Sequence, residues 1–374
     1  MREYLLTLFV AAAVTYLMTP VARRLAVRWG AMTAVRDRDV HAIPTPRLGG
    51  IAMLAGFSAA LLVASKMPFL GPSLHDGQDA SGLLSGAVII CLLGVADDRW
   101  QLDAITKLAG QVLAAGVMVL QGVQMLYLPL GATFVLGPVE GTVLTVLVVV
   151  VTVNAVNFVD GLDGLAAGIV AIAATAFFAF SYLLAVDQGL ERATTSTVIT
   201  AALIGTCLGF LPHNFSPARV FMGDSGAYLL GLLLASSTIT LTGTVDPGAV
   251  GSDIAPAILP LLLPVLVLVV PFADLLLAIV RRTRAGRSPF APDAQHLHHR
   301  LLEMGHSHAR AVIVMYLWAA VIAFGATAVV FLDARTLAVS LAVVVAVACL
   351  VTLNIPRLRR GPDTFTGIRR GLRR

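Results

Sequence analysis

The chain has 374 residues, of which 58% are hydrophobic and only 13% are charged. Soluble domains carry about twice that fraction of charge, and apolar runs of roughly 17–25 residues, long enough to cross a bilayer, recur along this chain. The composition excludes a soluble fold and predicts an all-α polytopic membrane protein, with one integral-membrane domain over 1–374 and a basic tail at 355–374. The net charge of +5 fits attraction to an anionic membrane surface and does not indicate nucleic-acid binding.

Hydropathy and the breaks made by Pro, Gly and charged residues predict about eleven membrane-spanning helices. The first, 3–22, is followed rather than preceded by its basic residues, which indicates a retained span and not a cleaved signal peptide. The segment 127–141, broken by Pro and Gly, is expected to form a small hairpin on the outer side. The other spans are expected near 49–67, 82–96, 106–122, 141–157, 163–185, 196–212, 225–243, 254–280, 310–331 and 337–354.

The loops between these spans are of two kinds that alternate along the chain. The segments 23–47 and 281–300 and the tail are basic, whereas the loops 73–80, 186–196, 244–253 and 332–336 are short and neutral or acidic. By the positive-inside rule the basic loops are cytoplasmic, so the N-terminus is expected outside and the C-terminus inside. An odd number of spans requires the same arrangement.

Polar residues gather in four segments that follow span ends on the predicted cytoplasmic side. In the first three segments taken together, carboxylates outnumber Lys and Arg, although the positive-inside rule favours Lys and Arg on this side. This pattern predicts one composite site just inside the membrane. The four segments are 96–107, 154–164, 213–226 and the histidine-rich loop 281–300.

Asp97 and Asp98 are adjacent carboxylates at a predicted helix end. Two like charges so close raise each other's proton affinity unless a cation compensates them. One interpretation is a helix cap or a solvated loop pair. The presence of three other polar segments on the same side favours a second interpretation, in which the two carboxylates lie between a metal ion and a proton to be removed.

The motif NAVNFVDGLDGLAAG, 154–168, places polar residues at every third position. Steps of three residues turn a helix by about 300°, so Asn154 and Asp163 would face nearly opposite directions in an unbroken helix. They can converge only if the backbone breaks, and Gly161 and Gly164 provide that break. The alternative is a plain polar turn between two spans.

Asp224 lies between glycines at the start of an apolar helix. The N-terminal amides and dipole of that helix suit phosphate, and Asp224 can hold a divalent cation that bridges to it. The alternative is an ordinary helix N-cap, and both interpretations can hold together.

The segment His296-Leu297-His298-His299 lacks the Glu of a zinc-binding HExxH helix. Imidazoles that donate to phosphate or carbonyl oxygens are therefore expected, with structural surface histidines as the alternative. Arg47, in the rigid segment HAIPTPRLGG, either meets a phosphate or simply obeys the positive-inside rule.

Taken together, the segments show no candidate nucleophilic Ser or Cys with an ordered base. Carboxylates, helix N-termini and basic loops instead indicate phosphate chemistry with a hard cation. Mg²⁺ takes one or two carboxylates plus substrate phosphate oxygens, and phosphoryl transfer needs positioning and charge neutralisation above all. A site that opens onto lipid implies one soluble phosphorylated substrate and one membrane-borne substrate.

These motifs occur in the order found in a known family, which the chain resembles over nearly its whole length: the polyprenyl-phosphate N-acetylhexosamine-1-phosphate transferases, including the MraY and WecA/TagO types. The resemblance implies transfer of a sugar-1-phosphate from a UDP-sugar to undecaprenyl or decaprenyl phosphate, with release of UMP. It also implies Mg²⁺, with Mn²⁺ as a substitute, and a multi-pass protein of the bacterial plasma membrane with a cytoplasmic site. The matching stretches are DD at 97–98, KLAGQ at 107–111, NAVNFVDGLDGLAAG, FMGDSGAYLLG and HLHHRLL.

The stretches PTPRLGG, GRSPF and HLHHRLL resemble the WecA/TagO branch, which favours UDP-GlcNAc as the donor and the first membrane step of a cell-envelope polymer pathway. Because Asp98 is followed by Arg99, Trp100 and Gln101, the lysine of the MraY pattern DDxxK is missing, and Lys107 matches a second family lysine. An MraY-type phospho-MurNAc-pentapeptide transferase is the alternative. A secondary transporter is a remote alternative, since transporters place their carboxylates near the bilayer midplane and here the carboxylates follow span ends.

The resemblance also implies roles for individual residues. Asp224 would be the principal Mg²⁺ ligand, and Asp97 would deprotonate the lipid phosphate, which attacks directly or through a two-step route. A homodimer is one option for the oligomeric state. The candidates are Asp97, Asp98, Asp160 and Asp163 as catalytic residues; Asn154, Asn157, Lys107, Arg47, His296, His298, His299 and Arg300 as substrate-binding residues; and Asp224, Asp97 and Asp98 as metal ligands.

Overall fold

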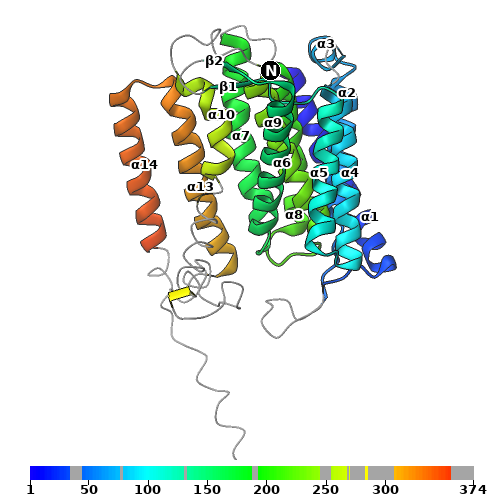
Figure 1. Cartoon of the computed structure of the whole chain (residues 1–374). Helices are drawn as coiled ribbons and strands as arrows, with labels where there is room; N and C mark the ends of the chain where they lie inside the picture. Colours follow the sequence, from blue (N-terminus) through cyan, green and yellow to red (C-terminus); the bar gives the residue numbers. More distant parts are fainter. Residues whose placement is uncertain are drawn as a thin grey trace, which may run out of the picture.

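A computed structural model shows a bundle of long helices with one short hairpin (Figure 1), which confirms the predicted all-α class. Each expected span coincides, over all or part of its length, with one of these helices. The structure describes residues 1–33, 44–75, 79–129, 133–187, 193–244, 254–267, 269, 283–284 and 307–354. The elements are α1 (Arg2–Trp29), α2 (Gly49–Ala64), α3 (Leu70–His75), α4 (Asp79–Trp100), α5 (Ala104–Leu120), β1 (Tyr127–Pro129), β2 (Thr133–Val135), α6 (Pro138–Val159), α7 (Leu165–Asp187), α8 (Ala193–Asn214), α9 (Gly223–Thr244), α10 (Ile254–Val267), α13 (His308–Phe331) and α14 (Ala334–Asn354).

Among the described residues, eight helices are long and apolar enough to cross a membrane, namely α1, α4, α6, α7, α8, α9, α13 and α14. The apolar helices α2 and α5 are somewhat shorter, at 16 and 17 residues. Such helices suit a bilayer because all their inner backbone polar groups bond within the same segment. The chain is therefore a multi-pass membrane protein.

The two ends of the bundle differ. The predicted hairpin is confirmed as the antiparallel pair β1–β2, and it lies with α3 at the end where the chain begins (Figure 1). Helix α14 ends at the opposite end of the bundle (Figure 1), as an odd number of crossings requires. The short helix α3 was not expected from the sequence.

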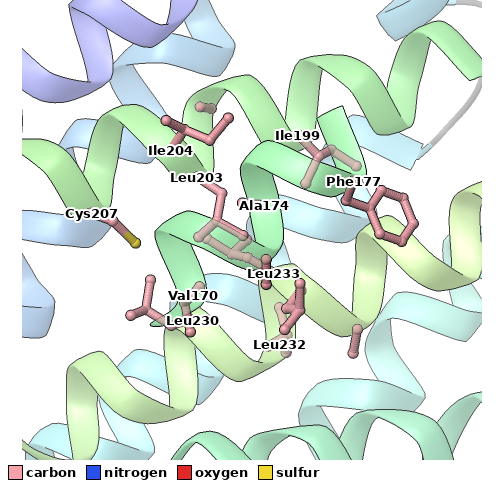
Figure 2. Packing of buried hydrophobic residues seen from close by; sticks show 14 of the residues in the cluster. Val170, Ala174, Phe177, Ile199, Leu203, Ile204, Cys207, Leu230, Leu232 and Leu233 are labelled. Carbon is pink, nitrogen blue, oxygen red and sulfur yellow. The ribbon is translucent and has the colours of Figure 1, made fainter. Parts of the chain in front are cut away.

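The core of the bundle surrounds α9, whose apolar stretch is entirely buried. Helices α4, α6 and α8 pack around it. Figure 2 shows the interior where Phe177 of α7, Leu203 of α8 and Leu233 of α9 lie among one another. Because α9 is central, its first residues lie in the middle of one end of the bundle.

Buried hydroxyl groups in this core bond mainly within their own helices. On α9, the hydroxyls of Ser236 and Ser237 donate to carbonyl oxygens four residues earlier. Thr206 of α8 does the same with Ala202. This back-bonding satisfies a polar side chain without a partner on a neighbouring helix.

Candidate active site

Three of the four predicted polar segments meet where α9 begins. Asn157, near the end of α6, donates through Nδ2 to Oδ1 of Asp224 at 2.7 Å. Asp98, near the end of α4, accepts from the backbone N–H of Asp224 at 2.9 Å. The predicted meeting of segments 96–107, 154–164 and 213–226 is therefore confirmed. The fourth segment, with His296, His298, His299 and Arg300, lies outside the described residues.

Asp97 is a buried carboxylate with several donors. Its Oδ2 forms an ion pair with Nζ of Lys107 at 2.5 Å and accepts from the hydroxyl of Tyr228 at 3.0 Å. Its Oδ1 accepts from the backbone N–H of Leu102 at 2.9 Å. The carboxyl groups of Asp97 and Asp224 also lie within hydrogen-bonding reach of each other. Two carboxylates from different helices thus face one another beside a single ammonium group.

Asp98 points in a different direction from its neighbour. Its Oδ1 and Oδ2 accept from the backbone N–H groups of Asp224 and Ser225, at 2.9 and 3.2 Å. The structure therefore places this predicted catalytic and metal-binding side chain against the backbone of α9.

The break after α6 lies where the sequence predicted it. Helix α6 ends at Val159 and α7 begins at Leu165. Gly164 has a φ of 78°, a left-handed conformation that favours glycine, and its N–H donates to Oδ1 of Asn214 at 3.1 Å. Gly161 has no positive φ, and a Cβ there would meet no atom within 4 Å. Gly164 alone therefore requires glycine in this turn.

The first and last polar residues of the predicted motif at 154–168, Asn154 and Asp163, bond to different elements. Asn154 donates through Nδ2 to Oε1 of Gln111 on α5 at 2.7 Å. Asp163 accepts through Oδ2 from the backbone N–H of Ala218, in the loop before α9, at 3.0 Å. Asn154 and Asp163, whose convergence was predicted, thus bond to different elements, and it is Asn157 that bonds to Asp224.

Asp160 lies just beyond the end of α6 and is half-buried. Burial raises its pKa to about 8, and the nearby carboxylates of Asp224 and Asp98 add to the rise, against the charge of Arg47. A carboxyl group whose proton affinity is raised by other carboxylates indicates a local excess of negative charge. Such an excess suits a cation.

The donor set fits a magnesium ion better than a closed structural metal site. Within the described part of the chain, no group of three or more His, Cys, Asp or Glu side chains is arranged to hold a metal ion. Mg²⁺ needs only one or two carboxylates, because water and substrate phosphate oxygens complete its shell. Asp224 and Asp97 meet that requirement.

The segment before α2 is joined to the segment before α9 through its backbone. The N–H groups of Gly49 and Gly50 donate to the carbonyl oxygens of Phe221 and Met222, each at 3.1 Å. A Cβ at Gly50 would lie 2.4 Å from the backbone N of Gly226. Glycine is therefore required for this close approach.

Arg47 belongs to the same segment. Its Nε donates to Oγ1 of Thr33 at 2.8 Å, and its charge acts on Asp160. The predicted phosphate contact of Arg47 thus stays a prediction, but its side chain lies on the side of the bundle where the carboxylates meet.

The sequence alone did not single out four residues of the site. Gln111 and Tyr228 lie inside the quoted motifs and contact Asn154 and Asp97. Asn214 bonds to the turn after α6, and the hydroxyl of Tyr316 on α13 donates to the carbonyl oxygen of Gly164 in that turn. The available signal was a polar side chain in an apolar helix, which is a functional candidate by default.

Comparison with known proteins agrees with this geometry. The model described as Glycosyl transferase family 4 matches residues 80–242, which include the carboxylates of the site. The decaprenyl-phosphate N-acetylglucosaminephosphotransferase of Mycolicibacterium smegmatis is 48% identical over 369 residues, covering 97% of this chain and 91% of the relative. The protein of that name from Mycobacterium tuberculosis is 47% identical over 371 residues, covering 98% and 92%.

A more distant relative is the undecaprenyl-phosphate alpha-N-acetylglucosaminyl 1-phosphate transferase of Yersinia pestis, 31% identical over 316 residues, with 81% of this chain and 78% of the relative covered. The alignments with the mycobacterial proteins extend over nearly the whole length of both partners. The chain therefore belongs to glycosyl transferase family 4, among the polyprenyl-phosphate N-acetylhexosamine-1-phosphate transferases of the WecA/TagO type.

Proposed function

We propose that the chain transfers N-acetylglucosamine-1-phosphate from UDP-GlcNAc to a polyprenyl phosphate at the cytoplasmic face of the bacterial plasma membrane. UMP and the lipid-linked sugar diphosphate are the products. The reaction is the first membrane step in the synthesis of a cell-envelope polymer. The names of the relatives support both the sugar and the lipid acceptor. The observation that carries the proposal is the meeting of Asp97, Asn157 and Asp224 at one end of an apolar helix bundle.

The reaction is a direct displacement at phosphorus. An oxygen of the lipid phosphate attacks the β-phosphorus of UDP-GlcNAc, the bond from that phosphorus to the bridging oxygen breaks, and UMP leaves with the electron pair. Asp97 accepts the proton that remains on the lipid phosphate. A phosphate monoester loses its second proton near a pKa of about 6, so a weak base suffices at neutral pH.

Asp224 and Asp97 would hold a magnesium ion, for which manganese would substitute. When bound, the ion neutralises the charge that develops on the diphosphate. Asn157 fixes the carboxyl group of Asp224 by donating to one of its oxygens. The predicted substrate contacts are Asn154, Asp160, Asp163, Lys107 and Arg47 around the nucleotide and diphosphate, and His296, His298, His299 and Arg300 at phosphate or sugar.

The test is UMP release by the purified full-length protein in lipid nanodiscs that contain polyprenyl phosphate and Mg²⁺. UDP-GlcNAc and UDP-MurNAc-pentapeptide are supplied in separate reactions, with nanodiscs lacking polyprenyl phosphate as the control. We expect UMP release with UDP-GlcNAc that requires the lipid acceptor. Release with UDP-MurNAc-pentapeptide only would contradict the proposal and indicate an MraY-type enzyme.

A further inference from the structure

The start of α9 is held by a carboxylate from another helix. A helix usually receives its cap from the residue that precedes it, whose side chain accepts from the first backbone N–H groups. Phe221 and Met222, which precede α9, have no such acceptor. Asp98 of α4 takes that place, because its two oxygens accept from the N–H groups of Asp224 and Ser225.

Helix α4 and the start of α9 approach each other closely both at Asp98 and one turn before it. Gly223 has a φ of 68°, and a Cβ there would lie 2.3 Å from Oδ2 of Asp98. Gly94, one turn earlier on α4, faces the backbone of Ser225, where a Cβ would lie 2.3 Å from Cα. Asp98 itself is only 7% exposed. The backbone of α9 therefore begins directly against α4, at a position that this carboxylate fixes.

Asp97 and Asp98 consequently have different surroundings although they are adjacent. Successive residues of a helix point about 100° apart. Asp97 faces Lys107, Tyr228 and the side chain of Asp224, whereas both oxygens of Asp98 are occupied by backbone N–H groups. We infer that Asp98 is a positioning residue, which fixes the start of α9 and so places Asp224, and is neither the base nor a metal ligand. This inference rests on the proposed function for the chemistry that Asp224 serves.

Hydrogen exchange of the metal-free, full-length protein tests the structural half of the inference. In Asp98→Asn the amide keeps one acceptor oxygen but presents an NH₂ group to the second N–H. We expect exchange in peptides that cover residues 224–226 to become faster by roughly 10-fold or more, because two hydrogen bonds that close these amides are weakened. Asp224→Asn should leave the exchange unchanged, since its backbone N–H still donates to Asp98.

Asp103→Asn is the matched control. Asp103 also caps a helix, α5, where its Oδ1 accepts from the N–H groups of Ile105 and Thr106 at 3.0 and 3.1 Å. It is exposed, and its cap lies on α5 and not on α9. This variant should leave both the exchange at 224–226 and the rate of UMP release as in the wild type.

UMP release tests the functional half. We expect Asp98→Asn to release UMP roughly 10–100-fold more slowly and to need several-fold more Mg²⁺ for half-maximal rate, as is usual when a residue that orients a metal ligand is changed. Loss of activity with unchanged exchange would overturn the inference, because Asp98 would then act directly as base or ligand. Faster exchange with wild-type activity would overturn it as well. Absence of UMP release by the wild type would instead contradict the proposed function, while the exchange would still report on the placement of Asp98.

Gly223→Ala keeps the inference testable if Asp98→Asn does not fold. The variant adds one methyl group against Asp98 and leaves every carboxylate in place. It should speed exchange at 224–226 and raise the Mg²⁺ requirement in the same direction. Gly116→Ala on α5 is its control, because a Cβ there would meet no atom within 4 Å. Wild-type exchange and kinetics in Gly223→Ala would overturn the inference.

Discussion

Tyr228 shows how a residue that orients a carboxylate can matter at this site. Its ring is buried in α9, and its hydroxyl donates to Oδ2 of Asp97, the oxygen that also pairs with Lys107. Two donors from different helices therefore fix one carboxylate. Removing one of them leaves the carboxylate in place but less well oriented.

Tyr228→Phe should lower kcat for UMP release by about 10-fold, because residues that orient a reacting group typically contribute on that order. The KM for UDP-GlcNAc should change little, since the hydroxyl contacts Asp97 and is buried. Steady-state kinetics measure both constants. Tyr182→Phe, the same change in the aromatic cluster with Tyr4 and Phe178, is the control and should behave as the wild type. An equal fall in both variants would contradict the assigned role.

Asp160 predicts a dependence of stability on pH. Its pKa is raised to about 8 in the folded protein, against about 4 for a free carboxyl group. Between these two values the folded protein binds more protons than the unfolded chain, so this contribution to stability is complete below about pH 4 and is lost as pH rises through about 8. A bound cation favours the ionised form and opposes that loss.

The Tm of the metal-free protein should therefore be lower at pH 8.5 than at pH 6.5, and Mg²⁺ should raise the Tm more at the higher pH. Thermal unfolding followed by intrinsic fluorescence measures the four conditions. In Asp160→Asn the Tm difference between the two pH values should shrink. An equal effect of Mg²⁺ at both pH values would contradict this prediction.

At the scale of elements, the site depends on how closely α2, α4 and α9 approach one another. The start of α2 lies against the first turn of α9, with Gly50 facing the backbone of Ser225 and Gly226. A backbone neighbour cannot move aside as a flexible side chain can. Close contacts between helix starts, and not side-chain bonds alone, therefore set the positions of the carboxylates.

Gly50→Ala should destabilise the protein by about 1–3 kcal/mol, the usual cost of overpacking a tight contact, and should also slow UMP release. Gly116→Ala should be neutral or stabilising by about 0.5–1 kcal/mol, because alanine suits an open helix position better than glycine. Thermal unfolding and the UMP assay compare the two variants. If they are equally stable, the approach of α2 to α9 is looser than described.

The sequence predicted the long helices and the meeting of four polar segments, three of which lie within the described residues, because hydropathy, loop charge and motif spacing are local properties. It did not predict the partner of each polar side chain. The bond from Asp98 to the backbone of Asp224 joins residues 126 positions apart, and that from Asn154 to Gln111 joins two helices. Such contacts depend on how the helices pack against one another. The spacing of three residues between the polar positions from Asn154 to Asp163 carries no information about that packing.

At the scale of the whole molecule, the orientation in the membrane stays a prediction from the charges of the loops. Asp103 and Asp333 are exposed, and each lies directly before a helix, at the predicted inner and outer face respectively. Cys91 and Cys207 are buried, and Cys349 on α14 is exposed. These positions allow a direct test of sidedness.

In a Cys349→Ser background, Asp333→Cys should react with a membrane-impermeant maleimide on intact cells. Asp103→Cys should react only in inverted vesicles, because the positive-inside rule places that loop in the cytoplasm. Mass spectrometry or a gel shift measures labelling in both preparations, and the Cys349→Ser background alone shows the reaction of the remaining cysteines. The reverse pattern would mean that the carboxylate cluster faces the outside.

The back-bonded hydroxyls of the core have a consequence for how α9 keeps its place along its own axis. Ser236, Ser237 and Thr238 donate to carbonyl oxygens of α9 itself, so these bonds would survive a slide of the helix past its neighbours. The bonds that tie α9 to other helices include the one from Ser196 to the carbonyl oxygen of Ser237 and, in its first two turns, those with Asp98 and Asp97 of α4. Asp97 and Asp98 therefore hold α9 along its axis at the end that carries the chemistry, and loss of their bonds would let this end of the helix shift relative to α4.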